Sequence, residues 1–362
     1  MRFVNLRLFG AGLLMVGGLF LIQPVASEAS SSYINLDIPG AARDVGAGKI
    51  KIEGGFNVHN NTGHYWNAAT GYSKVDLASG VVTSMGKPEN INSNMGGDPF
   101  GLYDPASNSF YGATFAGSDA SYVYKYDYAS NTWADPIRSV NIYSGAMSSG
   151  ELYISGLRKP WSGGYDDNYI SLFDWSGEGY HDALIDTGGA SASVALDKQG
   201  NVYYANYNPA GGTELFRWSA RQVDGVKNDL AGGAVDTFLT LADGEKLSDL
   251  PGGGNGITVD DAGHVFVTTN SMSEGKSRLM MWNGVAGEGD NFDLIASNPD
   301  GSFAWFGPMS IEGDFTKGDS LYGSFGWNGP ITEITSAVPL PGALWLMGSG
   351  LLGLVGVRRR RN

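Results

Sequence analysis

The stretch that decides the fold is Val194-Ala195-Leu196-Asp197-Lys198-Gln199-Gly200-Asn201-Val202-Tyr203, which reads as an apolar strand, a polar turn and an aromatic strand. The same order recurs at residues 101–111 and 257–266, and weaker copies lie at residues 145–153, 55–66 and 310–322. Short alternating runs of this kind, bounded by Gly, Asn, Asp and Ser, predict antiparallel strands joined by tight turns.

A second sequence element follows each copy of the first, and it is a strand that ends in a small polar residue. Its six copies end at Asp76, Asp127, Asp174, Ser219, Asn283 and Thr335. Two independent elements that alternate six times, about 50 residues apart, indicate a repeat architecture in which each repeat holds four short strands. The sequence therefore predicts an all-β fold: a single β-propeller of about six four-stranded blades.

Propellers close their ring by completing one blade from both ends of the chain. Residues 33–38 form a spare strand-like segment, and the last repeat lacks a strand after Thr335. We therefore expect residues 33–38 to pair with the final blade. Outside the two ends of the chain no window shows helical periodicity, so no further helix is expected.

The repeats resemble known propeller families in places. Residues 126–133 look like the outer arm of a kelch repeat, and residues 196–203 look like an NHL-type inner hairpin. The paired glycines of kelch repeats do not recur consistently, so the choice between the two families stays open. Either resemblance implies a propeller and no particular activity.

The N-terminus has the pattern of an export signal. Arg2 and Arg7 precede an apolar run at residues 8–22, and small residues around 26–29 offer a cleavage site. This pattern predicts a signal peptide at residues 1–29 and places the propeller at residues 30–337. A membrane-anchored N-terminus is the alternative.

The C-terminus, residues 338–362, has three parts in a fixed order. Val338-Pro339-Leu340-Pro341 comes first, an apolar run at residues 343–357 follows, and Arg358, Arg359, Arg360 and Arg361 end it. The prolines keep the stem extended. The apolar run is marginal in length for a transmembrane helix, and the arginines favour a cytoplasmic end.

This tail resembles a PEP-CTERM sorting signal, in a variant that carries Val-Pro-Leu-Pro where the name-giving Pro-Glu-Pro would stand. The resemblance implies a Gram-negative bacterium that makes exopolysaccharide, and a membrane protease-transpeptidase, exosortase, as partner. It also implies export through the inner membrane, transient membrane anchoring through the C-terminal helix, and a secreted or surface location after C-terminal processing. Because members of this group carry unrelated bodies, the resemblance implies no biochemical activity.

Composition narrows the classes of partner. The formal net charge is −14, and loss of the signal peptide and the tail arginines makes the body more acidic still. An acidic body without a basic patch repels nucleic-acid phosphates, so no nucleic acid is expected as a partner. The chain has no cysteine, which excludes disulfides and thiolate metal sites.

Residues that could carry chemistry are few. Asp104, Asp197 and Asp260 share one repeat position and are expected to cap turns. The four histidines, at positions 59, 64, 181 and 264, lack metal-ligand spacing, and His264 stands where the earlier repeat has Asn201. We find no nucleophile elbow, phosphate loop or zinc motif, so no catalytic residue is assigned and no cofactor is expected.

The candidate ligand-binding residues lie in Gly- and Pro-rich loops. Trp161, Trp305 and Trp327 are candidates for exposed indoles that stack on a sugar, whereas the tryptophans near blade arms (66, 133, 175, 218 and 282) are expected between blades. Asp166 and Asp167 could hold calcium through hard oxygen ligands. Whether any metal binds is left open.

One long departure from the repeat lies at residues 219–256 and is rich in acidic residues. Insertions in repeat proteins map to loops on one face, so we expect the ring to fold without residues 228–250. Taken together, the sequence predicts an exported binding or structural module of an extracellular biofilm matrix, with polysaccharide as its ligand. The rival is a secreted propeller enzyme of the lactonase, lyase or glycosidase type.

Overall fold

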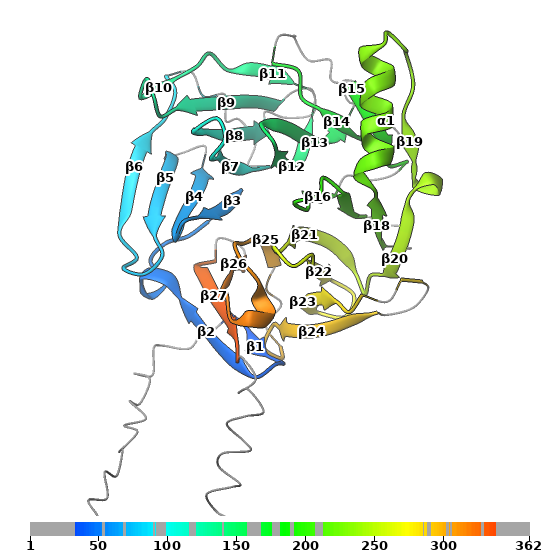
Figure 1. Cartoon of the computed structure of the whole chain (residues 1–362). Helices are drawn as coiled ribbons and strands as arrows, with labels where there is room; N and C mark the ends of the chain where they lie inside the picture. Colours follow the sequence, from blue (N-terminus) through cyan, green and yellow to red (C-terminus); the bar gives the residue numbers. More distant parts are fainter. Residues whose placement is uncertain are drawn as a thin grey trace, which may run out of the picture.

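The computed structural model describes residues 33–337 with gaps, and the gaps are residues 53–54, 68–69, 90, 92–98, 116–120, 140, 158–167, 176–181, 189–191, 207–212, 285, 288–290, 302–303, 305 and 327–328. In that part of the chain six β-sheets are arranged around a central axis (Figure 1). The predicted six-bladed propeller is confirmed. No helix among the described residues is long and apolar enough to cross a membrane.

The first three blades follow one another along the chain. Blade one is β3 (Phe56–His59), β4 (Thr62–Asn67), β5 (Gly71–Asp76) and β6 (Val82–Gly86). Blade two is β7 (Gly101–Asp104), β8 (Ser109–Phe115) and β9 (Ser121–Asp127), with β10 (Thr132–Trp133) and β11 (Ile137–Ser139) both paired to β9. Blade three is β12 (Ile142–Ser148), β13 (Glu151–Leu157), β14 (Asn168–Leu172) and β15 (Asp182–Asp186), to which β19 (Leu239–Thr240) adds in parallel.

The remaining blades complete the ring. Blade four is β16 (Ser193–Leu196), β17 (Val202–Ala205), β18 (Glu214–Trp218) and β20 (Glu245–Asp249). Blade five is β21 (Gly253–Val259), β22 (Val265–Ser271), β23 (Lys276–Trp282) and β24 (Phe292–Ser297), with β1 (Asn35–Leu36) on its outer edge. Blade six is β25 (Phe306–Ile311), β26 (Leu321–Phe325), β27 (Ile331–Ser336) and β2 (Gly40–Asp44).

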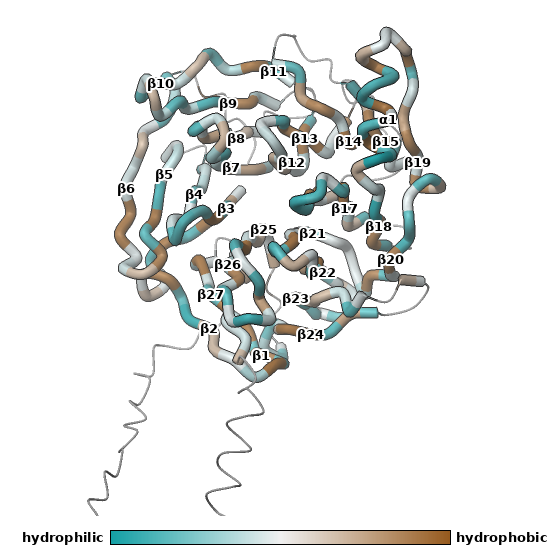
Figure 2. Tube along the Cα trace, in the orientation of Figure 1, coloured by the Kyte–Doolittle hydropathy of each residue, from teal (hydrophilic) through white to brown (hydrophobic). Residues whose placement is uncertain are grey.

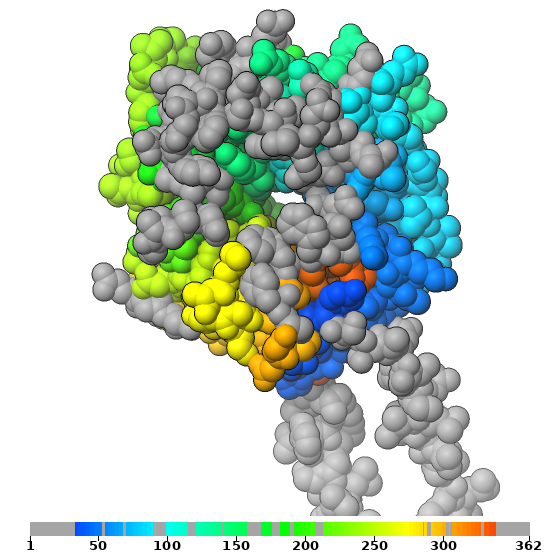
Figure 3. All heavy atoms as spheres, turned by 180° about the vertical axis from the view of Figure 1, so that it is seen from behind, coloured from blue at the N-terminus to red at the C-terminus, as the bar shows by residue number. Residues whose placement is uncertain are grey.

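The ring has two faces, which the direction of the strands defines. On the turn face the first and second strands of each blade are joined, by residues 60–61, 105–108, 149–150, 197–201, 260–264 and 312–320. On the entry face the innermost strand of each blade begins, at Phe56, Gly101, Ile142, Ser193, Gly253 and Phe306. The space-filling view from behind leaves an opening at the middle of the ring (Figure 3).

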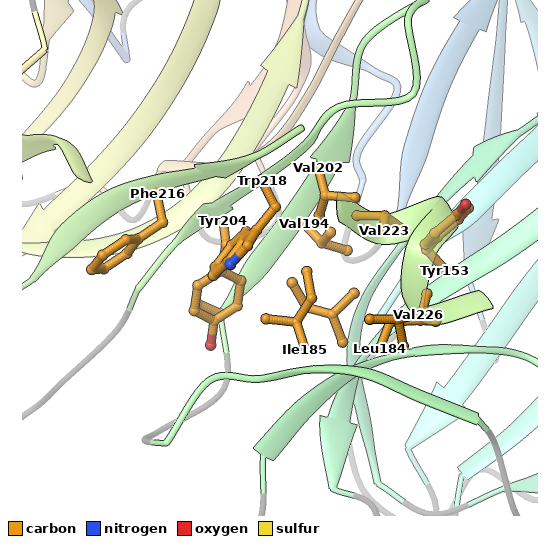
Figure 4. Packing of buried hydrophobic residues seen from close by; sticks show 12 residues of the cluster. Tyr153, Leu184, Ile185, Val194, Val202, Tyr204, Phe216, Trp218, Val223 and Val226 are labelled. Atoms are coloured by element: carbon orange, nitrogen blue, oxygen red, sulfur yellow. The ribbon is translucent and has the colours of Figure 1, made fainter. Parts of the chain in front are cut away.

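The hydrophobic core is divided among the boundaries between blades. Each of the six clusters of buried apolar residues in the described structure joins two neighbouring blades. Figure 4 shows the cluster between blades three and four, where Trp218 and Tyr204 face Ile185. Apolar positions are accordingly spread around the whole ring (Figure 2). Strands inside a blade, such as β17, are buried on both faces, which explains continuous apolar runs such as Val202–Ala205.

The closing strand is not the predicted one. Residues 40–44, as β2, pair with β27 from Gly40↔Ser336 to Asp44↔Thr332 and so complete the final blade. Residues 33–38 were expected there, but β1 pairs with β24 of blade five instead. Closure from both ends of the chain is confirmed, whereas the prediction that residues 33–38 supply the closing strand was wrong. The segment of residues 40–44, with its glycine and two alanines, has little of the β-branched character that marks a strand.

The long insertion also differs from its prediction. It holds a helix, α1 (Ala220–Ala231), which begins at a capping box formed by Ser219 and Gln222 and buries Val223 and Val226. It also holds η2 (Leu241–Asp243) and β20, the outer strand of blade four. Deleting residues 228–250 would therefore remove part of a blade, and the expectation of an expendable loop was wrong. The two remaining short helices are η1 (Val45–Gly48) and η3 (Phe315–Lys317).

Candidate functional site

A cavity among the described residues follows the axis of the ring and is called the axial channel here. Its volume is about 760 Å³. The innermost strands β3, β7, β12, β16, β21 and β25 line it, and the lining includes residues near both the entry face and the turn face. The sequence predicts no particular lining, because the innermost strands differ in residue type from blade to blade.

The described channel lining is almost free of charge. Asp104 is the one ionisable acid or base among the lining residues that the structure describes, apart from the tyrosines. Its two carboxylate oxygens accept the backbone N–H groups of Ala106 and Ser107 at 3.1 Å each, so the carboxylate holds its own turn. The rest of the polar surface comes from hydroxyl and amide side chains and from backbone. A neutral, hydrogen-bonding ligand matches this surface better than an ion does.

Several of these hydroxyl and amide groups join neighbouring blades. The Oγ of Ser144 accepts the Val194 N–H at 3.3 Å between blades three and four. Likewise, the Ser310 Oγ accepts the Val58 N–H at 2.9 Å between blades six and one. Such latches consume polar groups that would otherwise face a ligand.

Two further latches involve an asparagine, one through its side chain and one through its backbone carbonyl. Asn57 Oδ1 accepts the Tyr103 N–H at 2.9 Å between blades one and two. The Ser193 hydroxyl donates to the Asn255 carbonyl at 2.7 Å between blades four and five. Sequence reasoning missed all of these contacts, because a lone Ser or Asn in a strand gives no signal of its partner.

The turn aspartates behave as the sequence predicts. Asp197 Oδ1 accepts the Gln199 and Asn201 N–H groups at 2.9 Å each, and its Oδ2 accepts from the Asn201 amide at 2.7 Å. Asp260 Oδ1 binds the N–H groups of Ala262 and His264 at 3.0 and 2.8 Å in the same way. His264 Nδ1 lies 2.8 Å from Asp260 Oδ2 and thus takes the place of the Asn201 amide.

Asp260, His264 and Asp314 form the one described group of side chains with the spacing of a metal site. The Phe315 N–H also donates to Asp260 Oδ2 at 3.1 Å, and the Lys317 ammonium lies 2.8 Å from Asp314 Oδ2. Hydrogen bonds from Lys317 and Thr316 hold the pKa of Asp314 at about 2. A cation would have to displace these donors, so the cluster is best explained as a latch between blades five and six.

His64 is the most deeply buried of the described histidines. Burial, with smaller effects from Lys74 and His59, lowers the pKa of His64 to about 3. Its Nδ1 lies 2.6 Å from the Tyr72 hydroxyl, and its ring stacks on Tyr103 with centroids 4.4 Å apart. It is therefore neutral at physiological pH and belongs to the packing between blades one and two.

The predicted ligand-binding residues Trp161, Asp166, Asp167, Trp305 and Trp327 lie outside the described residues, as do the sorting-tail residues 338–362. The described strand ends that flank these loops can nevertheless be assigned to one of the two faces of the ring. Pairing of Leu157 with Asn168 and of Phe306 with Phe325 places the flanking ends of β13, β14, β25 and β26 on the entry face. Of the tryptophans predicted between blades, Trp66 and Trp218 are fully buried, whereas Trp175 is 36% exposed.

Comparison with known proteins identifies the tail. Residues 337–361 match the PEP-CTERM protein-sorting motif. The chain therefore carries this motif at its C-terminus, and the motif indicates export and exosortase-mediated sorting to the cell surface or the extracellular space. No curated protein matches the sequence.

Solved structures share the fold at low sequence identity. The pyranose dehydrogenase PQQ domain from Coprinopsis cinerea aligns with a TM-score of 0.55 and 11% identity over 86% of this chain and 99% of that one. A calcium structure of a Carbohydrate-Active Enzymes Family AA12 protein from Trichoderma reesei gives 0.55 and 13% over 84% and 98%. The calcium-binding protein regucalcin from Agrobacterium tumefaciens gives 0.50 and 16% over 84% and 99%. These likenesses extend to the propeller fold alone.

Proposed function

We propose that this exported propeller is a binding module of the extracellular matrix and that its ligand is a neutral carbohydrate. The observation that carries the proposal is the axial channel, whose described lining is polar but nearly uncharged. It consists of backbone groups and of hydroxyl and amide groups, some of them bonded between blades, with a single, already bonded carboxylate. Sugar hydroxyls both donate and accept hydrogen bonds, so such a lining can bind them without the desolvation cost of a charge.

The candidate tryptophans extend the proposal to the mouth of the channel. Trp161, Trp305 and Trp327 belong to loops whose flanking strands end on the entry face, and the channel lining includes Gly326, which directly precedes Trp327. Indoles at this mouth would stack on the apolar faces of sugar rings. In this arrangement the channel would bind one end or a side group of a chain, and the indoles would bind the neighbouring residues.

The experiment is binding of the full chain, solubilised in detergent, to an array of neutral and acidic glycans. Trp161→Ala, Trp305→Ala and Trp327→Ala should each weaken binding by about five-fold or more, at about 1–3 kcal/mol per lost stacking contact. Trp175→Ala is the matched control, because Trp175 is exposed but follows β14 on the turn face. An equal effect of all four substitutions, or preferential binding of the acidic glycans, would contradict the proposal.

Calcium is a separate proposal that rests on Asp166 and Asp167. Their carboxylates are hard oxygen ligands, and the solved structures of this fold include the calcium-binding protein regucalcin and a calcium structure of a Family AA12 protein. Calorimetric titration of the full chain should give heat that disappears in Asp166→Ala and is retained in Asp224→Ala, an exposed acid on α1. Heat that survives Asp166→Ala would place calcium elsewhere.

A secreted propeller enzyme is the second candidate, favoured by the sugar dehydrogenase domain among the proteins of this fold. Such an enzyme needs converging acids, bases or a cofactor in the channel. The described lining supplies Asp104 alone as a carboxylate, so catalytic groups would have to come from the loops at the entry face. Turnover of an aldose or a lactone, abolished by substitutions in those loops and unaffected by Asp104→Asn, would favour this candidate.

A further inference from the structure

We propose that, while the sorting tail holds the protein at the membrane, the turn face of the ring lies toward the phospholipid surface and the entry face points outward. The proposal rests on the apolar run at residues 343–357 lying in the bilayer before processing, as the sequence predicts. It does not depend on which ligand the channel binds. The argument comes from where the chain leaves the ring and how far it can then reach.

The chain leaves the ring on the turn face. Strand β27 begins beside Ser324 at the entry face and pairs Ile334 with Leu321, the first residue after the turn-face loop of blade six. The Ser336 hydroxyl then donates to the Phe315 carbonyl of that loop at 2.6 Å. The Ala337 N–H donates to the Pro39 carbonyl at 2.8 Å, and the sorting motif begins at this same residue.

The stem that follows is too short to reach around the ring. From Ala337 to the first residue of the apolar run, Ala343, a fully extended chain spans at most about 20 Å. The last strand, β27, has six residues and so spans about 20 Å between the entry face and the turn face. A stem that starts on the turn face would use its whole length to run back along β27, with none left for the reversal of direction, so it cannot bring the entry face to the bilayer.

The turn face carries two exposed lysines but no net positive patch at these positions. Lys317, in the loop that Ser336 contacts, has a side chain that is 80% exposed, and Lys198 on the turn of blade four is 64% exposed. Each ammonium group pairs with a carboxylate, Asp314 and Asp261 respectively. The orientation therefore rests on the exit point of the chain and the length of the stem, and not on attraction to charged headgroups.

The chain offers a direct test because it has no cysteine. Ala262→Cys labels the turn face of blade five, and Met272→Cys labels the entry face of the same blade. Both positions are exposed, so a fluorophore is tolerated at either. The labelled full-length variants are reconstituted, with their tails intact, into phosphatidylcholine vesicles that contain a headgroup nitroxide lipid.

We expect the label at position 262 to lose most of its fluorescence to the nitroxide and the label at position 272 to lose little. Equal quenching at both positions would mean that the ring stands on its edge, and stronger quenching at 272 would mean that it is inverted; either result overturns the proposal. A second pair, Ser107→Cys on the turn face and Thr70→Cys on the entry face, repeats the measurement in case a variant of the first pair fails to fold. The quenching result does not depend on whether a variant binds glycan. The proposed orientation and the proposed carbohydrate binding can therefore be contradicted independently.

Discussion

Asn270 of blade five holds Phe306 of blade six by both of its backbone polar groups. The Asn270 side chain accepts the Phe306 N–H at 2.9 Å and donates to the Phe306 carbonyl at 3.0 Å. Asn255 donates to the same carbonyl. One side-chain amide thus satisfies the backbone N–H and carbonyl of Phe306 as a neighbouring strand would. It does so across a blade boundary, where β22 and β25 are not paired as strands.

Asn270→Ala is therefore expected to lower the free energy of unfolding by about 2 kcal/mol, because it leaves the buried Phe306 N–H without an acceptor. Urea denaturation monitored by tryptophan fluorescence would measure the loss. Asn228→Ala is the matched control, since Asn228 is exposed on α1 and should change stability by less than about 0.5 kcal/mol. A result in which both variants behave alike would mean that the latch adds nothing.

Two glycines are expected to respond to alanine in opposite directions. At Gly112 an added Cβ would lie 2.6 Å from the Trp66 ring across the boundary between blades one and two, so Gly112→Ala should destabilise the fold by about 1–3 kcal/mol. At Gly225, inside α1, an added Cβ meets nothing within 4 Å, so Gly225→Ala should stabilise by about 0.5–1 kcal/mol. Thermal melts of the two variants give the comparison. Destabilisation by both would contradict the helical packing of α1.

The neutral state of His64 should make stability fall in mild acid. The unfolded chain binds a proton at this position near its ordinary pKa of 6.5, whereas the folded pKa is about 3. The unfolded state therefore binds more protons between these values, and the free energy of unfolding should drop as pH falls through this window, by up to about 1.4 kcal/mol per pH unit. Urea midpoints from pH 7 to pH 4 would show it. In His64→Gln the slope should become shallower; an unchanged slope would assign the effect to other groups.

The turn-face cluster of Asp260, His264 and Asp314 gives a test of structural against metal-binding roles. His264→Asn should retain stability, because Asn201 already makes the equivalent bond to Asp197. His264→Ala should cost about 1 kcal/mol, since the buried Asp260 carboxylate loses one of its donors. Zinc or calcium should leave the melting temperature of both variants and of the parent protein unchanged. A metal-dependent rise that only His264→Ala abolishes would contradict the latch.

Ring closure can be tested by shortening the N-terminus of the body. A chain that begins after Asp44 loses β2, leaves β27 as an unpaired edge, and should unfold at a markedly lower temperature. A chain that begins after Ile38 loses only β1 and should keep most of its stability. Limited proteolysis would locate the opened blade at residues 331–336. Because the longer truncation removes both strands, equal destabilisation would mean that the loss of β2 adds nothing to the loss of β1.

The repeat could be predicted because its signals are local. The turn aspartates at 104, 197 and 260 stand at a fixed distance from the strands beside them, and each makes the predicted bonds within its own turn. Blade number and sheet type follow from such repeated units. The sequence also showed that His264 stands at the repeat position where the earlier repeat has Asn201. The structure explains this difference, because each of the two side chains bonds to the turn aspartate of its own repeat.

The unpredicted features depend on contacts between distant residues. The pairing of Arg43 with Glu333 joins positions 290 residues apart, and nothing local in residues 40–44 indicates it. The helix α1 was not predicted because Gly225 and the many polar residues of the helix weaken the periodic apolar pattern. Only Val223 and Val226 of this helix are buried. The channel has no sequence signature, because its latches place unlike residues, Ser or Asn, at unlike positions.

The pairing of β2 with β27, near the two ends of the described chain, restricts when the ring can form. Strand β2 has no partner until β27 has been synthesised and has crossed the membrane, although almost the whole ring is made before it. Contacts of such long sequence separation form slowly, because a long loop must close first. The final blade therefore closes last, once residues 331–336, which directly precede the sorting motif, are available to pair with β2.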